Sequence, residues 1–225
     1  KAPMAGVPHH AARQYIAQLI DKGFRVAICE QTEDPKEAKG LVAREVVRVI
    51  SPGTIVEEDM LRQDQNNYIL SITRVAGKWG LAFADISTGE LGSTEIEETQ
   101  LTTLLGEVNR LQPREMLINR ELTDNLDYID FYKSLDQPPL EKPYEMYMGQ
   151  QQAKEVIKKL FGVANLDGFG LEDKGAALVA SAALCKYLLE SQKKPLNYLR
   201  SCRYYSLKDY MVLDAHTRRN LELNK

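Results

Sequence analysis

The sequence of 225 residues lacks the glycine-rich loops that hold nucleotide phosphates. Neither G-x-x-x-x-G-K-[ST] nor G-x-G-x-x-G occurs in it. The pair of glycines in Gly168-Phe169-Gly170 is isolated and has no strand-turn-helix pattern around it, which is typical of a loop turn. We therefore expect no nucleotide cofactor within this chain.

Cysteine and histidine are scarce, with three of each. Cys29, Cys185 and Cys202 form no C-x-x-C pair, and this usage is typical of a reducing compartment such as the cytoplasm. Cys29 and Cys185 lie in apolar segments, so we expect both to be buried as small hydrophobic residues. Two of the histidines are adjacent and the third is distant in sequence, so the sequence predicts no metal site.

Long apolar runs are also missing. The most apolar stretch, residues 175–185, has about half of the ~20 residues that a membrane-spanning helix needs. Residues 1–8 lack the apolar core of a signal peptide. We therefore expect no membrane partner.

A strong excess of basic residues, the usual mark of a protein that coats nucleic acid, is absent because the net charge is −3. The charge is unevenly distributed. Residues 1–48 contain eight Lys or Arg and six Asp or Glu, whereas the remainder contains 21 and 26. An excess of two is consistent with a DNA contact near the N-terminal end, and equally with a fluctuation on a solvated surface.

The first 50 residues predict part of an α/β unit. Apolar residues at helical spacing are followed by two β-prone runs, which a polar loop containing Pro35 separates. Ser51-Pro52-Gly53-Thr54 then predicts a tight turn, and the apolar pattern lapses over residues 55–66. The expected elements are a helix over 9–22 and strands over 24–30 and 41–50.

The middle of the chain predicts a β-β-β-α-β series. Turn residues at 76–78 and at 88–89 separate short β-prone runs, which is typical of antiparallel hairpins. The expected elements are strands over 67–75, 79–87 and 90–96, a helix over 98–111 and a strand over 114–119.

The last third predicts mainly helices. Residues 136–144 hold three of the nine prolines, and we expect an irregular crossover there. An amphipathic helix is expected next, and then a helix that is apolar nearly all round in its first half and therefore buried on more than one side. The elements expected after the crossover are helices over 149–161 and 172–192, a β-like segment over 203–214 and a further helix in 215–225.

Asp85 is a candidate metal ligand. It lies on the second strand of the β-β-β-α-β series, where ribonuclease-H-like nucleases place their first metal-binding Asp. Two-metal chemistry needs several carboxylates that hold metals ~3.5–4 Å apart. The other acidic candidates are Glu115, Glu121, Glu172 and Asp173. One Asp in this position does not distinguish a nuclease from a strand-end Asp that accepts hydrogen bonds from its own turn.

The segment Pro3-Met4-Ala5-Gly6-Val7-Pro8-His9-His10 is an apolar loop that leads into the first expected helix. Some proteins insert apolar wedges with nearby cations into the minor groove and kink the duplex at flexible steps. An ordinary loop packed against a core would have the same composition. The residues alone leave both interpretations open.

Several segments resemble one family. PMAGVPHHA, VAICEQTEDPKEAKG and REVVRVISPGT resemble the back half of the mismatch-binding domain of bacterial MutS proteins. ADISTGEL resembles the connector domain of that family, and LDAHTRRNLEL resembles the start of its core, or lever, domain. The segments occur in family order over the whole chain.

The resemblance implies an α/β fold in four parts. These are the C-terminal part of a mixed α/β mismatch-binding domain over 1–54, a linker over 55–66, a ribonuclease-H-like connector over 67–201 and the start of a helical core over 202–225. The connector of the family has no known nuclease activity, which agrees with the sparse carboxylates.

The resemblance also implies partners and cofactors. MutS proteins act as homodimers that bind mismatched double-stranded DNA, hydrolyse ATP with Mg²⁺ in a distant domain and recruit a MutL-type protein. The mismatch-reading Phe-x-Glu motif lies before Lys1 in the family, and the ATP-binding motif lies beyond Lys225. We therefore expect an internal piece of a longer ATPase, which is not itself an enzyme.

Candidate DNA-proximal residues follow from the loop. Met4 is the one expected nearest the minor groove, and Arg44 and Arg48 are candidate phosphate contacts, although strand alternation could direct them to solvent. The full set is Pro3, Met4, Ala5, Gly6, His9, Arg44 and Arg48.

A candidate surface for the MutL-type partner is the polar face of helix 149–161, with Gln151, Lys154 and Lys158. The rival function is a metal-dependent nuclease centred on Asp85. A relative that acts on recombination intermediates is disfavoured, because such proteins usually lack a segment like 1–54.

Overall fold

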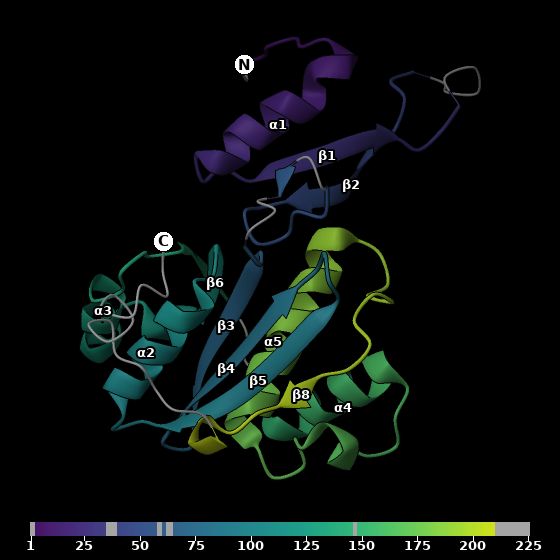
Figure 1. The fold of residues 1–225 in the computed structure, drawn as a ribbon. Coiled ribbons are helices and arrows are strands. Elements are labelled where there is room, and N and C mark those ends of the chain that lie inside the picture. Colours follow the sequence, from purple (N-terminus) through teal and green to yellow (C-terminus); the bar gives the residue numbers. More distant parts are fainter. Residues whose placement is uncertain (1–2, 35–39, 58–59, 62–64, 146–147, 210–225) are drawn as a thin grey trace.

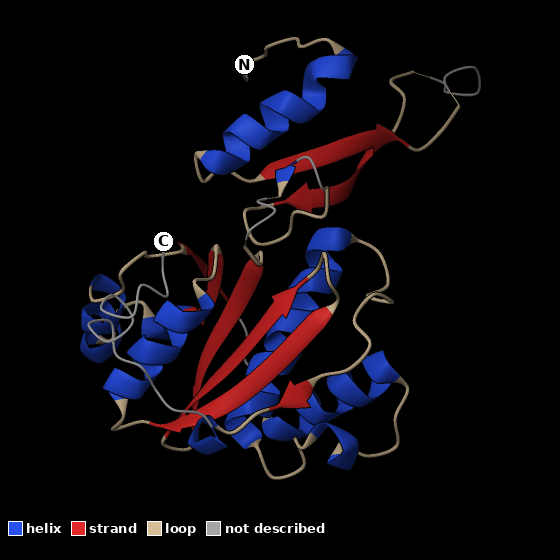
Figure 2. Ribbon diagram, viewed as in Figure 1, coloured by secondary structure: helices blue, strands red, loops and turns tan. Residues whose placement is uncertain are grey.

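A computed structural model describes residues 3–34, 40–57, 60–61, 65–145 and 148–209 (Figure 1). A small N-terminal unit of one α-helix and a two-stranded sheet lies at one end of a larger unit built on a six-stranded sheet (Figure 2). The mixed α/β fold class expected from the sequence is confirmed. In the part of the chain that the structure describes, no helix is long and apolar enough to cross a membrane.

The small unit matches the elements expected for the first 50 residues. A short 3-10 turn, η1 (His9–Ala11), leads into α1 (Ala12–Asp21), and β1 (Val26–Gln31) pairs antiparallel with β2 (Arg44–Ile50). Its buried apolar cluster comprises Ile20, Ile50 and Ile55, with partly buried neighbours from both the helix and the strands. A single helix on two strands thus encloses a very small core.

The prediction that Cys29 is buried is wrong, because the structure places it in the exposed class. Val26 and Ile28 of β1 contact the small cluster, and side chains along a strand alternate between its faces. The register of β1 against β2 shifts between Ile28 and Cys29, which interrupts this alternation, and Cys29 is not among the residues of the cluster. The sequence signal was an apolar run, which does not tell which of its residues face a core.

The larger unit confirms the predicted β-β-β-α-β order. Its first three strands form an antiparallel meander, and the next strand returns parallel to the first. This gives the sheet order β7-β6-β3-β4-β5-β8. The elements are β3 (Tyr68–Val75), β4 (Lys78–Asp85), β5 (Glu90–Glu97), α2 (Leu101–Leu111) and β6 (Glu115–Asn119).

Both faces of this sheet are covered. Side chains such as Ile69 and Ala84 belong to one buried cluster with α4 (Gln150–Phe161) and α5 (Gly175–Gln192), whereas Leu70 and Phe83 belong to another with α2 and α3 (Leu126–Lys133). Figure 1 shows α5 running along the sheet. The prediction of a helix buried on more than one side is confirmed, since most residues of α5 are buried.

Gly80 explains how closely α5 approaches the sheet. A Cβ atom at Gly80 would lie 2.0 Å from the carbonyl oxygen of Ala176 in the first turn of α5. No side chain fits in that space, so glycine at this position lets the helix backbone rest directly on β4.

Three parts of the larger unit differ from expectation. Residues 140–144 form β7 (Leu140–Tyr144) instead of an irregular crossover; β7 is an edge strand, where Pro143 is tolerated. The helix α3 was not predicted. Of the β-like segment expected over 203–214, the structure describes residues 203–209, which form β8 (Arg203–Tyr204) and the 3-10 turn η5 (Leu207–Asp209). The remainder of that segment and the helix expected in 215–225 lie outside the described residues.

Candidate functional site

The loop before α1 is exposed along its described length. Residues 3–10 are all in the exposed class, and Met4 is 96% exposed. Within the described residues the loop therefore packs against no core, and both interpretations of its apolar residues stay predictions. His9 and His10 begin the turn that leads into α1. Apolar side chains displayed in this way are typical of a surface that another molecule covers.

The two candidate phosphate-binding arginines have different surroundings on β2. Arg44 is exposed, at the start of the strand. Arg48 turns inward: its Nη1 donates to Glu57 Oε1 at 2.6 Å, and its Nη2 donates to the carbonyl oxygen of Thr54 at 3.2 Å. Arg44 is thus available to an approaching phosphate, whereas Arg48 fastens the segment that follows the strand.

The pair formed by Arg48 and Glu57 is half-buried, with the two side chains 19% and 23% exposed. Burial alone would raise the pKa of Glu57, but the hydrogen bond and the positive charge of Arg48 outweigh it, so the pKa of Glu57 lies below its usual value. The carboxylate of Glu57 is therefore charged at neutral pH and neutralises much of the charge of Arg48.

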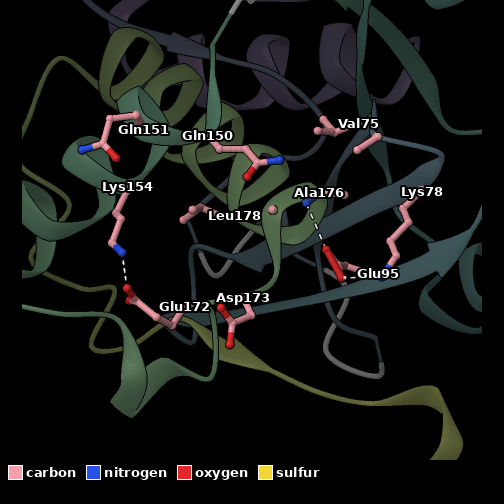
Figure 3. A pocket seen from close by; sticks show the side chains of 12 residues that line it. Val75, Lys78, Glu95, Gln150, Gln151, Lys154, Glu172, Asp173, Ala176 and Leu178 are labelled. Atoms are coloured by element: carbon pink, nitrogen blue, oxygen red, sulfur yellow. Dashed lines mark hydrogen bonds and ion pairs between the residues drawn. The ribbon is translucent and has the colours of Figure 1, made fainter.

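The polar face of α4 borders a pocket of about 440 Å³ (Figure 3). The pocket lies where the N-terminal ends of α4 and α5 meet the β3–β4 hairpin. Gln151 and Lys154 line it, as the predicted partner surface requires, and Lys158 lies one helical turn beyond Lys154. The structure therefore brings two of the three predicted surface residues to the rim of a concave feature.

Charged groups from other elements line the same pocket. Lys154 forms an ion pair with Glu172, and this hydrogen bond lowers the pKa of Glu172. Glu95 Oε1 accepts a hydrogen bond from the backbone N–H of Ala176 at 3.0 Å, near the positive end of the α5 dipole. Lys78 Nζ lies 3.6 Å from Glu95 Oε2. The lining is thus polar, with charges of both signs.

Sequence reasoning missed Lys78, Glu95 and Asp173 as neighbours of α4. They come from β4, β5 and the approach to α5, which lie far apart along the chain. No local pattern could have joined them, because their proximity results from the packing of two helices on the hairpin.

Asp85 is engaged in its own turn. The carboxylate is buried; Oδ1 accepts hydrogen bonds from the backbone N–H and the hydroxyl of Ser87 at 2.9 and 2.6 Å, and Oδ2 accepts one from the N–H of Asn67 at 3.0 Å. These contacts confirm the interpretation as a strand-end Asp that binds its own turn.

Glu115 does not join Asp85. Its Oε1 accepts from the hydroxyl of Tyr187 in α5 at 2.7 Å, so it lies on the α5 face of the sheet. Asp85 pairs across the strands with Tyr68, whose ring packs with the cluster on the other face. Among the residues that the structure describes, no group of three or more His, Cys, Asp or Glu is placed to hold a metal ion. The described carboxylates do not fit a two-metal site.

A small α/β unit joined to a six-stranded sheet of order β7-β6-β3-β4-β5-β8 defines a two-unit α/β protein. Models of MutS domain I and MutS domain II match residues 1–59 and 67–200. The chain belongs to the MutS family.

Three relatives show how the chain relates to longer proteins, and each is named DNA mismatch repair protein MutS. The chain is 44% identical over 223 residues to the one from Halothermothrix orenii, covering 99% of this chain and 25% of that protein. It is 39% identical over 233 residues to the one from Lachnoclostridium phytofermentans (100% and 24%) and 40% identical over 237 residues to the one from Symbiobacterium thermophilum (100% and 26%). The chain thus spans about a quarter of the length of these relatives.

Proposed function

We propose that this chain is the segment of a mismatch-repair protein that joins a DNA-facing unit to a connector domain. The observation that carries the proposal is the exposed loop of residues 3–10, which displays Met4 and Val7 at the tip of the small unit. Apolar side chains in such a loop match the wedges that proteins insert into the minor groove.

In this proposal Pro3, Ala5 and Gly6 shape the loop, and His9 and Arg44 supply polar contacts to the DNA backbone. Arg44 is better placed than Arg48 for a phosphate contact, because the charge of Arg48 is already paired with Glu57. The DNA would be mismatched double-stranded DNA, as the names of the relatives suggest.

The longer protein, as we propose it, is a homodimeric ATPase of the cytoplasm that uses ATP and Mg²⁺. The residues of this chain do not fit an ATP site, since the sequence has no phosphate-binding loop. Three free cysteines are compatible with a reducing compartment. The chain itself would contribute positioning and no chemical step.

Binding of the isolated chain to duplex DNA tests the DNA-facing role. We expect weak binding with no preference for a G·T mismatch, because no Phe-x-Glu motif is present. Few phosphate contacts predict a shallow dependence on salt, with a slope of about −0.9 for each neutralised phosphate. Met4→Ala and Arg44→Gln should weaken binding, whereas Leu126→Ala, which alters an exposed leucine on α3, should not.

Fluorescence anisotropy over a salt titration would measure these effects. A steep slope, or a clear preference for the G·T duplex, would contradict the proposal that the mismatch reader is missing from this chain.

We also propose that the face of α4 bordering the pocket binds a MutL-type protein. The support is the concave polar surface that Gln151 and Lys154 share with carboxylates from β5 and from the segment just before α5. Lys158→Glu is the cleanest test, because charge reversal at Lys154 would also break its ion pair with Glu172. A matched control is Lys133→Glu, an exposed lysine at the end of α3.

Biolayer interferometry with the MutL-type protein would compare these variants. Weaker binding of Lys158→Glu alone supports the surface, and unchanged binding of both Lys158→Glu and Gln151→Ala would remove it.

The rival nuclease can be tested directly. The chain, incubated with Mg²⁺ or Mn²⁺ and branched or nicked DNA, should show no turnover that depends on Asp85, because both oxygens of that carboxylate accept hydrogen bonds from its own turn and from Asn67. Turnover that is abolished by Asp85→Asn would overturn the proposed scaffold role.

A further inference from the structure

The chain passes from the small unit to the connector through Ser51-Pro52-Gly53-Thr54, and this turn is buried against Glu115 of β6. Glu115 Oε2 accepts hydrogen bonds from the Ser51 hydroxyl and from the backbone N–H of Gly53, the latter at 3.2 Å. Glu115 Oε1 accepts from the Tyr187 hydroxyl at 2.7 Å. One carboxylate thus binds both the turn and the connector helix α5.

The turn has a fixed shape that fits this contact. Ser51 N–H donates to Thr54 Oγ1 at 2.8 Å, and Thr54 N–H donates to the carbonyl oxygen of Ser51 at 3.0 Å. A Cβ atom at Gly53 would lie 2.8 Å from the Cβ of Ile69 and 2.9 Å from the Cβ of Glu115. Only glycine lets the backbone approach the sheet so closely.

The burial of Glu115 makes its hydrogen bonds to the turn important for stability. The residue is fully buried, and a buried carboxylate is costly unless its oxygens accept hydrogen bonds. Oε1 of Glu115 accepts a hydrogen bond from Tyr187 of the connector. Among the described contacts, Oε2 accepts hydrogen bonds only from donors of the turn. Separation of the turn from the sheet would leave that oxygen buried without a partner, or would draw water into the joint.

Other polar links between the units are weaker. An ion pair joins Arg114 Nη2 and Asp21 Oδ1, but its length is 3.9 Å and Asp21 is largely exposed. Exposed pairs of this kind contribute little to stability. Of these two described polar links, the buried bonds of Glu115 are therefore expected to hold the two units together more strongly than the pair of Arg114 and Asp21.

We propose that Glu115 is an interdomain latch, which fixes the orientation of the small unit on the connector by binding the Ser51–Thr54 turn. The latch does not require the chain to bind DNA, so it stands independently of the proposed function. Its partner is the small unit of the same chain, and its specificity comes from the hydroxyl of Ser51 and the N–H of Gly53.

Hydrogen exchange of the 225-residue chain tests the latch with Glu115→Gln. The amide of glutamine preserves the shape, but it is neutral and has one acceptor oxygen in place of two, so the turn loses its charged acceptor whichever way the amide is oriented. We expect the Gly53 amide to exchange about tenfold faster, the size expected for loss of a hydrogen bond to a charged group. Emission of Trp79, which is the only tryptophan and is buried in the connector, should not change.

Two further variants separate the latch from a general effect on folding. Glu95→Gln alters another buried carboxylate of the same sheet, which binds the Ala176 N–H away from the turn, and should leave Gly53 exchange unchanged. Ser51→Ala removes one donor from the turn without altering the connector, and should speed Gly53 exchange by a smaller factor.

A distance measurement gives an independent readout. Cys29 is exposed, whereas Cys185 and Cys202 are buried, so spin labels at Cys29 and at Leu126→Cys would report the separation of the two units. Glu115→Gln should broaden this distance distribution. The proposal is overturned if Gly53 exchange and the distribution match the unaltered chain, if Glu95→Gln has the same effect, or if Trp79 emission shifts in Glu115→Gln.

Discussion

The connector encloses two extended apolar clusters, one on each face of its sheet, whereas the small unit encloses three buried isoleucines under one helix. Burial of apolar surface is the main source of folding stability. The connector therefore has a core large enough to stabilise its own fold. The small unit depends far more on the joint through which it is attached.

The exposed apolar residues of the small unit also indicate that this unit depends on contacts outside its own core. The small unit has a small core and nevertheless exposes several large apolar side chains, which include Met4, Tyr15, Leu19 and Phe24. The connector has few exposed residues of this type, of which Leu126 is the most prominent among those described. The difference indicates that the small unit presents its apolar surface to other molecules or other parts of a longer protein.

The largest effect should come from breaking the close contact between α5 and the sheet. Gly80→Ala places a Cβ where the Ala176 carbonyl oxygen lies 2.0 Å away, so α5 must shift. We expect a loss of about 3 kcal/mol in the free energy of unfolding of the connector, at the upper end for overpacking. Urea unfolding followed by Trp79 fluorescence would measure it.

Gly168→Ala is the matched control, because a Cβ there meets nothing within 4 Å. Similar losses in Gly80→Ala and Gly168→Ala would show that the contact with Ala176 does not govern the stability of the connector.

A smaller and more local effect is expected from the small unit. Ile20→Ala removes most of one of its three buried apolar side chains, and we expect a loss of about 2 kcal/mol, at the lower end for such truncations. Hydrogen exchange should accelerate in β1 and β2, while the urea midpoint reported by Trp79 stays unchanged. An equal shift of the Trp79 midpoint would mean that the two units unfold as one cooperative block.

The ion pair of Arg48 and Glu57 should contribute about 1 kcal/mol, since it is half-buried. The folded-state pKa of Glu57 lies below its usual value of 4.5, so this contribution is complete above that pH and is lost as the pH falls through the lowered pKa. Glu57→Gln should therefore destabilise β2 at neutral pH and have little effect in acid.

Protection of the β2 amides, measured for both proteins over a pH series, would check this. A difference that persists undiminished in acid would contradict the role of the Glu57 charge.

The smallest effect is expected from Glu98→Gln on the connector. Its ion pair with Arg74 lies where β3 and β5 end, with both side chains about one-third exposed. Exposed pairs typically contribute less than about 1 kcal/mol. The loss in free energy of unfolding, from the urea midpoint reported by Trp79, should be smaller than the loss in free energy that the β2 amide protection reports for Glu57→Gln. A larger loss in Glu98→Gln would reverse the order proposed for the two ion pairs.

Local sequence patterns predicted much of the connector and little of the joint. Alternating β-prone runs and glycine turns define β3, β4 and β5, because those signals act between neighbours in sequence. The three prolines near β7 indicated an irregular segment, since sequence does not tell an edge strand from a loop.

Glu115 illustrates what sequence could not supply. Its place on the strand after Asp85 makes it a candidate metal ligand by sequence, but the two carboxylates lie on opposite faces of the sheet. Its actual partners, Ser51 and Tyr187, lie more than 60 residues away in both directions along the chain. Likewise, the pairing of Arg48 with Glu57 depends on how the chain folds back after β2.

We propose that the small unit faces DNA through its exposed loop while the connector does not. A photo-crosslinking amino acid placed at Met4, with the same substitution at Leu126 as a control of similar exposure, would test it most directly with labelled duplex DNA. We expect crosslinks from position 4 and few from position 126. Equal crosslinking at both positions, or none at position 4, would contradict it.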